Sequence, residues 1–286
     1  MNKKVEERKQ ELVSEFIHCL DENLLPWEKG WNMVYHKNII TGKKYRGINQ
    51  LILMYVANKF HYSSEIWGTF QQMKSQKLKI KAGSKSKKII YYSWHDKERK
   101  ENISYYEMKN RIEDGRDDEE FYPVSRLYDV FNVEDTENYC SKKEKENDID
   151  FISDYLKKEN ITLTFGGNDA YYNPSLREIR IPNKEQFKSN NSYYSTILHE
   201  IAHSTMTKVD RIMPTEIEND EKYAFEELVA EISSVFLCCQ MQIEMEPLQN
   251  HKAYIKGWAS RIKSNSEYLF KAIKSAEKVT EYVLSV

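Results

Sequence analysis

The segment YYSTILHEIAHST, at residues 193–205, contains two histidines separated by three residues, with a glutamate directly after the first. On a helix, residues four positions apart lie on one face, so His199 and His203 can present two imidazoles to one metal ion. Glu200 lies beside them and is suited to take a proton from a water molecule that the ion activates. We therefore predict a helix that carries a metal site. The alternative is a chance match on a helix with two ordinary histidines.

A catalytic zinc site needs a third protein ligand and an open coordination position. In one class of zinc proteases that ligand lies six residues after the second histidine, but here the residue is Val209. Asp210 and His251 are further candidates, and neither has a supporting pattern.

The segment YAFEELVAEISSVFL contains a better candidate for the third ligand. Glu227 and Glu231 lie four positions apart on a predicted helix, among apolar residues. In such an arrangement Glu227 binds the ion, and Glu231 orients a ligand histidine as a hydrogen-bond acceptor. Glu226 points about 100° away and is expected to face elsewhere. The predicted metal ligands are His199, His203 and Glu227.

The predicted ion is Zn²⁺, which lowers the pKa of a bound water toward about 7. Mn²⁺ or another divalent ion is the alternative. Glu200 would then act as the catalytic base. Tyr171, Tyr172 and Tyr223 are candidates, by residue type alone, for the group that stabilises a developing oxyanion.

Charge is distributed unevenly along the chain. The 286 residues have a net charge of -2, yet residues 27–97 contain 14 Lys and Arg against 3 Asp and Glu, a net of +11. The rest of the chain has 29 basic and 42 acidic residues, a net of -13. Segregation on this scale indicates that one part of the chain meets a polyanion.

The same basic segment contains four of the five tryptophans. Single-stranded nucleic acid is bound by this combination, because cations follow the phosphates while aromatic rings stack on bases. The alternative is that the tryptophans are core residues and the lysines only keep the chain soluble. The residues that we predict to bind nucleic acid include Trp27, Trp31, Lys43, Lys44, Tyr45, Arg46, Lys85, Lys87 and Lys88.

Composition argues against a membrane or secreted protein. No stretch approaches the roughly 20 apolar residues of a membrane-spanning helix. The N-terminal MNKKVEERKQ lacks the apolar core of a secretion signal, and the four cysteines show no paired CxxC spacing. We expect a cytoplasmic protein with no membrane partner.

Apolar periodicity predicts the secondary structure. In the first half, we expect helices over residues 5–24 and directly after Gly47, and strands in KSKKIIYYSW (85–94) and SRLYDVFNVED (125–135). The charge-rich residues 98–120 between these strands are expected to form a mobile loop.

In the second half, ITLTFGG and REIRIP predict short strands. Helical patterns follow over about 191–206, 221–242 and 251–285, the last broken near Ser264. The predicted fold is α+β with two domains. Residues 1–135 form a mixed α/β domain, 136–147 a polar linker, and 148–286 a mostly helical domain with a small sheet.

Both halves of the chain resemble the ArdC-type antirestriction proteins. The motifs LPWEKGW, TGKKYRGINQLIL, WGTFQQ and YDVFNVED are similar to their N-terminal domain. AYYNPSLREIRIP, YYSTILHEIAHST and YAFEELVAEISSVFL, with the C-terminal helices, are similar to their zincin-like metallopeptidase domain. The motifs occur in the same order along most of the chain. One departure is TKVDRIM after the second histidine, which lacks a glycine-rich turn.

The resemblance implies a single-stranded DNA-binding domain joined to a zincin. Such proteins are carried by conjugative elements and phages, and are associated with protecting incoming DNA from restriction. It implies that Glu227 is the third metal ligand, and it adds Asn49 to the candidate DNA contacts. The implied partners are single-stranded DNA and an unidentified host protein as substrate.

Two other functions stay open at this point. One is a DNA-binding module whose metal site is structural or vestigial. The other is a metallopeptidase that acts on an unidentified protein, with a basic domain that serves another purpose.

Overall fold

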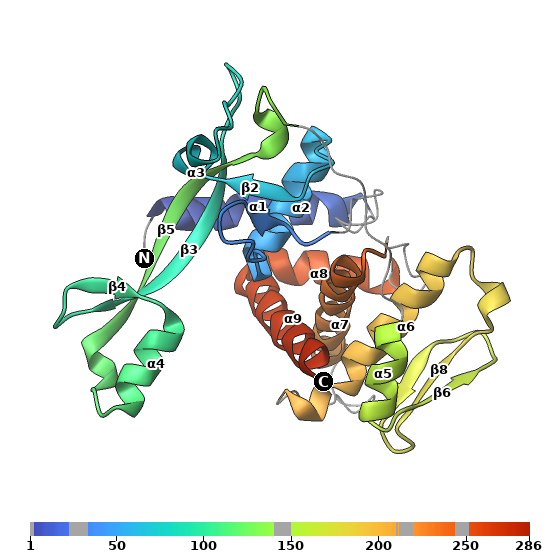
Figure 1. Ribbon diagram of the computed structural model, residues 1–286. Helices are drawn as coiled ribbons and strands as arrows, with labels where there is room; N and C mark the ends of the chain where they lie inside the picture. The colour runs from blue at the N-terminus through green and yellow to red at the C-terminus, as the bar shows by residue number, and fades with distance from the viewer. Residues whose placement is uncertain (1–2, 23–33, 140–149, 210, 212–219, 244–251) are drawn as a thin grey trace. The chain divides into compact units, whose positions relative to one another are not determined.

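The computed structural model describes residues 3–22, 34–139, 150–209, 211, 220–243 and 252–286 (Figure 1). The chain forms two compact units. The first contains Met1–Leu12 and Trp67–Tyr139, and the second contains Val13–Ile66 and Cys140–Val286. Residues 13–66 are thus grouped with the C-terminal half, although they belong to the predicted N-terminal domain. The predicted helix over 5–24 is α1 (Lys3–Asp21), which begins in the first unit and ends in the second.

The first unit is built on a long two-stranded antiparallel ribbon (Figure 1). β3 (Lys87–Asp96) pairs with β5 (Phe121–Asn132) from Lys87 opposite Val130 to Asp96 opposite Phe121. β2 (Ile66–Gly68) pairs with the end of β5, and β4 (Glu101–Ile103) pairs with the end of β3. The two predicted strands are therefore confirmed, and they are neighbours. β2 leads into α3 (Phe70–Ser75), which Thr69 begins with a capping box.

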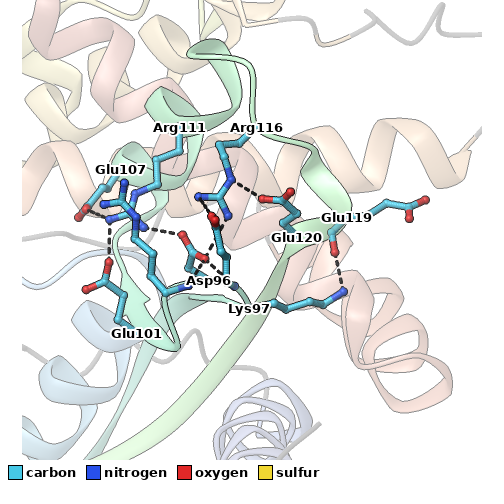
Figure 2. A network of polar contacts seen from close by, with 10 residues as sticks. Asp96, Lys97, Glu101, Glu107, Arg111, Arg116, Glu119 and Glu120 are labelled. Carbon is cyan, nitrogen blue, oxygen red and sulfur yellow. Dashed lines mark hydrogen bonds and ion pairs between the residues drawn. The ribbon is translucent and has the colours of Figure 1, made fainter.

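Residues 98–120 form a small structured lobe, so the predicted mobile loop is wrong. The lobe contains β4, α4 (Tyr105–Glu113) and η1 (Asp118–Glu120). Figure 2 shows the ionic network that holds it. The buried Asp96 carboxylate accepts hydrogen bonds from the guanidinium groups of Arg111 and Arg116. It also accepts the Arg99 backbone N–H at 3.0 Å.

The lobe also has a small apolar core, formed by Ile103, Met108 and Phe121 with Trp94 and Ile112 packed against it. Arg111 and Arg116 of the segment pair with four of its glutamates as well as with Asp96. The described part of the predicted linker, residues 136–139, is folded as well, because the Glu137 N–H donates to the Lys79 carbonyl at 2.9 Å. The other linker residues, 140–147, lie outside the described residues.

The second unit combines helices with a three-stranded sheet in the order β6-β8-β7. β6 runs parallel to β8 and β7 runs antiparallel to it. The two predicted strands are β6 and β8, and β7 is an additional strand in the segment between them. The strands are β6 (Thr162–Phe165), β7 (Tyr171–Asn173) and β8 (Glu178–Ile181), preceded in the chain by β1 (Lys37–Asn38). The helices are α2 (Gly47–Phe60), α5 (Asp150–Lys158), α6 (Asn190–Ser204), α7 (Asp220–Met241), α8 (Lys252–Ser264) and α9 (Glu267–Ser285).

One apolar core joins these helices to the sheet. Ile179 and Ile181 of β8, Ile197 and Ile201 of α6, and most of α7 are buried in it. Trp258 of α8 is fully buried, and its indole N–H donates to the Ala224 carbonyl of α7 at 2.7 Å. The predicted break near Ser264 is confirmed as the end of α8. The observed α+β architecture matches the predicted fold class.

The start of α2 depends on a glycine. Gly47 has φ +49°, and a Cβ at this position would lie 2.9 Å from Glu277 Oε2 of α9. The Arg46 guanidinium pairs with Glu281, one turn further along α9. Glycine suits this position, because it adopts the positive φ without strain and because a Cβ would force the Glu277 carboxylate to shift. Among the described residues, no helix is long and apolar enough to cross a membrane.

Candidate metal centre

The HEIAH segment lies in the second half of α6, as predicted. Ser189 caps the helix by accepting the Ser192 N–H at 3.1 Å. From Ser195 to Ser204 every residue of α6 is buried. His199, Glu200 and His203 therefore lie in a low-dielectric environment, where charge interactions are strong.

The two imidazoles converge on one point. His199 Nε2 and His203 Nε2 lie 3.1 Å apart. Glu227 Oε2 lies 3.6 Å from His199 Nε2, and Glu227 Oε1 lies 3.5 Å from His203 Nε2. Ligands bound tetrahedrally at 2.0–2.1 Å are about 3.3 Å from one another. The three side chains thus have the spacing of a tetrahedral site with one position left for a further ligand.

The Nδ1 atoms of the two histidines indicate what the space between the Nε2 atoms can hold. His199 Nδ1 faces Glu231 Oε2 at 3.5 Å, and His203 Nδ1 faces Glu226 Oε1 at 3.3 Å. Because carboxylates accept hydrogen bonds, they favour protons on both Nδ1 atoms. When both imidazoles are neutral, the two Nε2 lone pairs point toward each other and repel, and a proton on one Nε2 relieves this repulsion in the metal-free protein. A cation between them removes this repulsion, so the donor set fits a divalent metal ion.

Glu226 does not face elsewhere, and that expectation is wrong. Its carboxylate contacts His203, and it is held there by Arg211, whose guanidinium donates to Glu226 Oε1 at 2.6 Å. Arg211 also donates to the Ala202 carbonyl at 2.6 Å and to Thr205 Oγ1 at 2.7 Å. Arg211 therefore joins the C-terminal end of α6 to α7, beside the metal centre.

Each histidine has its own outer carboxylate. Glu231, the predicted outer partner, faces His199, and Glu226 faces His203. Glu226 and Glu227 can both face the site because the two imidazoles lie on successive turns of α6, on either side of Glu227. No sequence pattern pointed to Arg211, which lies in the segment that lacks the glycine-rich turn.

The carboxylates control the charge of His199. Burial by itself lowers the pKa of this histidine, but its interactions with Glu227 and Glu231, and the nearby charge of Glu200, raise the pKa well above the usual 6.5. The same negative potential favours a bound cation. Glu200 is buried next to His199, and its charge acts on that histidine.

Of the three candidate tyrosines, Tyr223 interacts with a predicted ligand, Glu227. It precedes Glu227 by one turn of α7, and burial together with the charge of Glu227 raises the pKa of its hydroxyl. Its ring packs on Tyr254, with centroids 5.7 Å apart. Tyr171 and Tyr172 lie on β7. Asp210 and His251, the alternative third ligands, lie outside the described residues.

The predicted DNA contacts belong to both units. The second unit contains Lys43, Lys44, Tyr45, Arg46 and Asn49, while the first contains Lys85, Lys87 and Lys88. Trp27 and Trp31 lie outside the described residues.

Several of these side chains bind within their own unit. The Lys44 ammonium binds Gln240 Oε1 and lies 5.0 Å from the centroid of the Tyr35 ring. Arg46 pairs with Glu281, and Lys88 pairs with Asp129 at 2.8 Å. Tyr45 accepts a hydrogen bond from Asn38 at 3.3 Å. Their charges are thus partly compensated inside the protein.

The fold and the metal-ligating side chains define a protein with a zincin-like domain, in which two α6 histidines and an α7 glutamate form the candidate metal centre. A family model described as a zincin-like metallopeptidase matches residues 151–275. A model of the N-terminal domain of the anti-restriction factor ArdC matches residues 6–131. The chain belongs to the ArdC-type antirestriction family.

Two crystal structures of the antirestriction protein ArdC from plasmid R388 have the same fold. The metal-free structure has a TM-score of 0.73 and the Mn(II)-bound structure 0.74; both are 24% identical to this chain and cover 97% of it. This chain in turn covers 96% and 97% of those two chains.

The similar sequences include proteins of different lengths. The protein y4eC of Sinorhizobium fredii is 26% identical over 91% of this chain and 84% of its own length. Two DNA primases TraC of Escherichia coli are 30% and 28% identical over 96% of this chain. The chain spans only 20% and 27% of the length of these primases.

Proposed function

We propose that this protein is a single-stranded DNA-binding antirestriction protein of a mobile element or phage, and that its zincin-like domain is a metal-dependent peptidase. The observation that carries the peptidase half is the convergence of His199 Nε2, His203 Nε2 and Glu227 on one point, 3.1–3.6 Å from one another. Three protein ligands with an open position are typical of catalytic rather than structural sites.

His199, His203 and Glu227 would hold the ion, and Zn²⁺ or Mn²⁺ suits the two imidazoles and one carboxylate. When bound, the ion supplies Lewis acidity toward a water molecule and a substrate carbonyl. Glu200 would take the proton from that water, and Glu231 and Glu226 would hold the two imidazoles in place. The Tyr223 hydroxyl, beside Glu227, could donate to the developing oxyanion. The substrate would be a host protein.

The DNA-binding half of the proposal rests on the family and on charge. The net charge of +11 over residues 27–97 supports an electrostatic interaction with a polyanion. The proposed contact residues are those predicted from the sequence, from Trp27 to Lys88. We propose the domain limits 1–135 and 148–286, joined by residues 136–147, and a protein that acts in the cytoplasm.

Two variants of the full chain test the proposal. His203→Ala should lose bound metal while single-stranded DNA affinity, measured at several salt concentrations, stays unchanged. Glu200→Gln should keep the metal and lose the protection of incoming DNA from restriction. If Glu200→Gln protects incoming DNA as well as the wild type does, hydrolysis is not the mechanism of protection. The protein is then a DNA-binding module with a structural metal site.

Salt dependence tests the DNA-binding half separately. Affinity for single-stranded DNA should fall steeply as salt rises, because binding releases the counterions of the phosphates. A chain that retains metal-dependent peptidase activity but does not bind single-stranded DNA would instead be a metallopeptidase with a different role for its basic segment.

A further inference from the structure

The pairing register of β3 and β5 divides the side chains of the ribbon between two faces. Residues directly opposite each other in an antiparallel pair lie on the same face, and neighbours along a strand alternate between faces. Tyr91 is opposite Arg126, and His95 is opposite Tyr122. The face that contains them, called the Tyr91 face below, consists of Lys87, Ile89, Tyr91, Ser93 and His95 from β3 and Tyr122, Val124, Arg126, Tyr128 and Val130 from β5.

Aromatic rings on the Tyr91 face are open to solvent. Tyr91, Tyr122 and Tyr128 are 49%, 44% and 41% exposed. The rings lie in two pairs: Tyr91 and Tyr128 pack edge to face with centroids 5.4 Å apart, and His95 and Tyr122 lie 5.0 Å apart. Rings that pack against one another lose little conformational freedom when a ligand stacks on them. The aromatic side chains of this face are therefore preorganised to stack on a ligand.

The charge of the Tyr91 face fits an anion. None of its ten side chains is a carboxylate, whereas Arg126 and Lys87 are cationic. The exposed Arg126 lies across the ribbon from Tyr91, so a positive charge and an aromatic ring are adjacent. Single-stranded nucleic acid needs both, because rings stack on bases while cations meet the phosphates.

The opposite face of the ribbon is also aromatic, but its charges are already paired. It contains Tyr92 and Trp94 together with Lys88, Asp96 and Asp129. Lys88 pairs with Asp129 at 2.8 Å, and the buried Asp96 pairs with arginines of the lobe. A lysine that is held by a carboxylate attracts a phosphate less than the cations of the Tyr91 face do, so the opposite face is less suited to nucleic acid.

We propose that the Tyr91 face binds single-stranded DNA by stacking unpaired bases on Tyr91, Tyr122 and Tyr128, while Arg126 contacts the phosphates. This proposal rests on the proposed DNA-binding function and gives it a surface of which the predicted contact residues include only Lys87. Tyr122 and Tyr128 are six residues apart on β5, which separates them by roughly 20 Å along the strand. The face is therefore long enough for several nucleotides.

Tyr91 and Tyr92 provide a matched comparison. They are neighbours on β3, they are 49% and 53% exposed, and they lie on opposite faces. Tyr106 of the neighbouring α4 is 71% exposed and serves as a second control. The experiment measures the affinity of the full-length wild type, Tyr91→Ala, Tyr92→Ala and Tyr106→Ala for a fluorescent oligothymidine and for a duplex of equal length. Circular dichroism and thermal unfolding establish that each variant is folded.

Tyr91→Ala should weaken oligothymidine binding about five- to 150-fold, the range that corresponds to one stacked base. Its duplex affinity should change little, since paired bases cannot stack on the ring. Tyr92→Ala and Tyr106→Ala should bind like the wild type. Photo-crosslinking provides an independent measurement. Oligonucleotides that contain 5-iodo-deoxyuridine should become attached to peptides that contain Tyr91, Tyr122 or Tyr128.

Two results would overturn the proposal in distinguishable ways. If the wild type binds oligothymidine but Tyr91→Ala binds equally well, or if Tyr92→Ala is weakened as much, the Tyr91 face is not the surface and the DNA-binding function stands. If the wild type does not bind oligothymidine at all, both the surface and the DNA-binding function are wrong.

Discussion

The Arg211 guanidinium donates a hydrogen bond to Glu226 Oε1 at 2.6 Å, on the oxygen that also faces His203 Nδ1. Arg211 is itself anchored to the end of α6 through the Ala202 carbonyl. The orientation of one metal-ligating imidazole therefore depends on a contact between α7 and the segment after α6.

Glu226→Gln tests this relationship. The amide retains the shape of the side chain but removes the charge that holds the proton on His203 Nδ1 and that pairs with Arg211. Metal affinity should fall about 10- to 100-fold, as is usual for the outer partners of metal-ligating histidines. Competition with a chromophoric chelator measures the affinity. The control is Glu185→Gln, at an exposed glutamate of the 3-10 helix η3 (Lys184–Gln186). An unchanged affinity would mean that Glu226 does not position His203.

Metal binding should also depend on pH. The carboxylates around His199 raise its pKa well above 6.5, so in the metal-free protein this histidine holds its proton to a higher pH than a free imidazole does. An ion must displace that proton, so affinity should rise as pH increases from about 6 to about 8. Calorimetry in buffers of different ionisation enthalpy should detect proton release on binding. Binding without proton release at neutral pH would contradict the raised pKa.

Gly47→Ala should destabilise the second unit. The new Cβ would meet Glu277 Oε2 at 2.9 Å, and the positive φ of +49° adds backbone strain. The strain alone costs about 1–2 kcal/mol. Gly42 has φ +64° with nothing within 4 Å, so Gly42→Ala carries the strain without the clash. Chemical denaturation should find Gly47→Ala less stable than Gly42→Ala. Equal stability would mean that Glu277 moves away at no cost.

The lobe formed by residues 98–120 should be sensitive to acid. The Arg99 backbone N–H, followed by the Arg111 and Arg116 guanidinium groups, outweighs burial and lowers the pKa of Asp96 from 3.8 to about 2. A carboxylate with a lowered pKa stabilises the folded state above its unfolded pKa, and this stabilisation is lost as pH falls from about 4 toward 2. Urea denaturation across this range should show a loss in the wild type that is reduced in Asp96→Asn. A wild type and a variant with the same pH profile would exclude Asp96 as the source.

Local spacing was enough to predict most of the candidate metal centre. His199, His203, Glu227 and Glu231 follow helical periodicity, and each pair separated by four residues shares a helix face whatever the tertiary structure is. Glu226 could not be placed in this way, because the side of α7 that meets α6 depends on how the two helices pack. Arg211 belongs to no helical pattern, and it has partners only because α7 and the end of α6 come together beside it.

The remaining differences arise from how charges are paired in space. The 98–120 segment was predicted to be mobile because its many charged residues suggested a solvated loop. In the structure Asp96, Arg111 and Arg116 neutralise one another around a small apolar core. The predicted DNA contacts were chosen because they lie close together in the sequence, yet the compact units separate Lys43–Asn49 from Lys85–Lys88. Tyr91 and Tyr92 lie on opposite faces of the ribbon, but the residues that share a face with each of them are known only once β5 is identified as the partner strand.

The central claim is that His199, His203 and Glu227 form one divalent metal site. Its most direct test is equilibrium metal binding by the full-length wild type and Glu227→Ala, measured with Zn²⁺ and with Mn²⁺. We predict that the wild type binds one ion per chain. Glu227→Ala should lose metal affinity by roughly 100-fold or more, which exceeds the loss expected on removing a hydrogen-bond partner of a ligand histidine. The thermal unfolding of this variant should stay cooperative. Wild-type affinity in a folded Glu227→Ala protein would contradict the account.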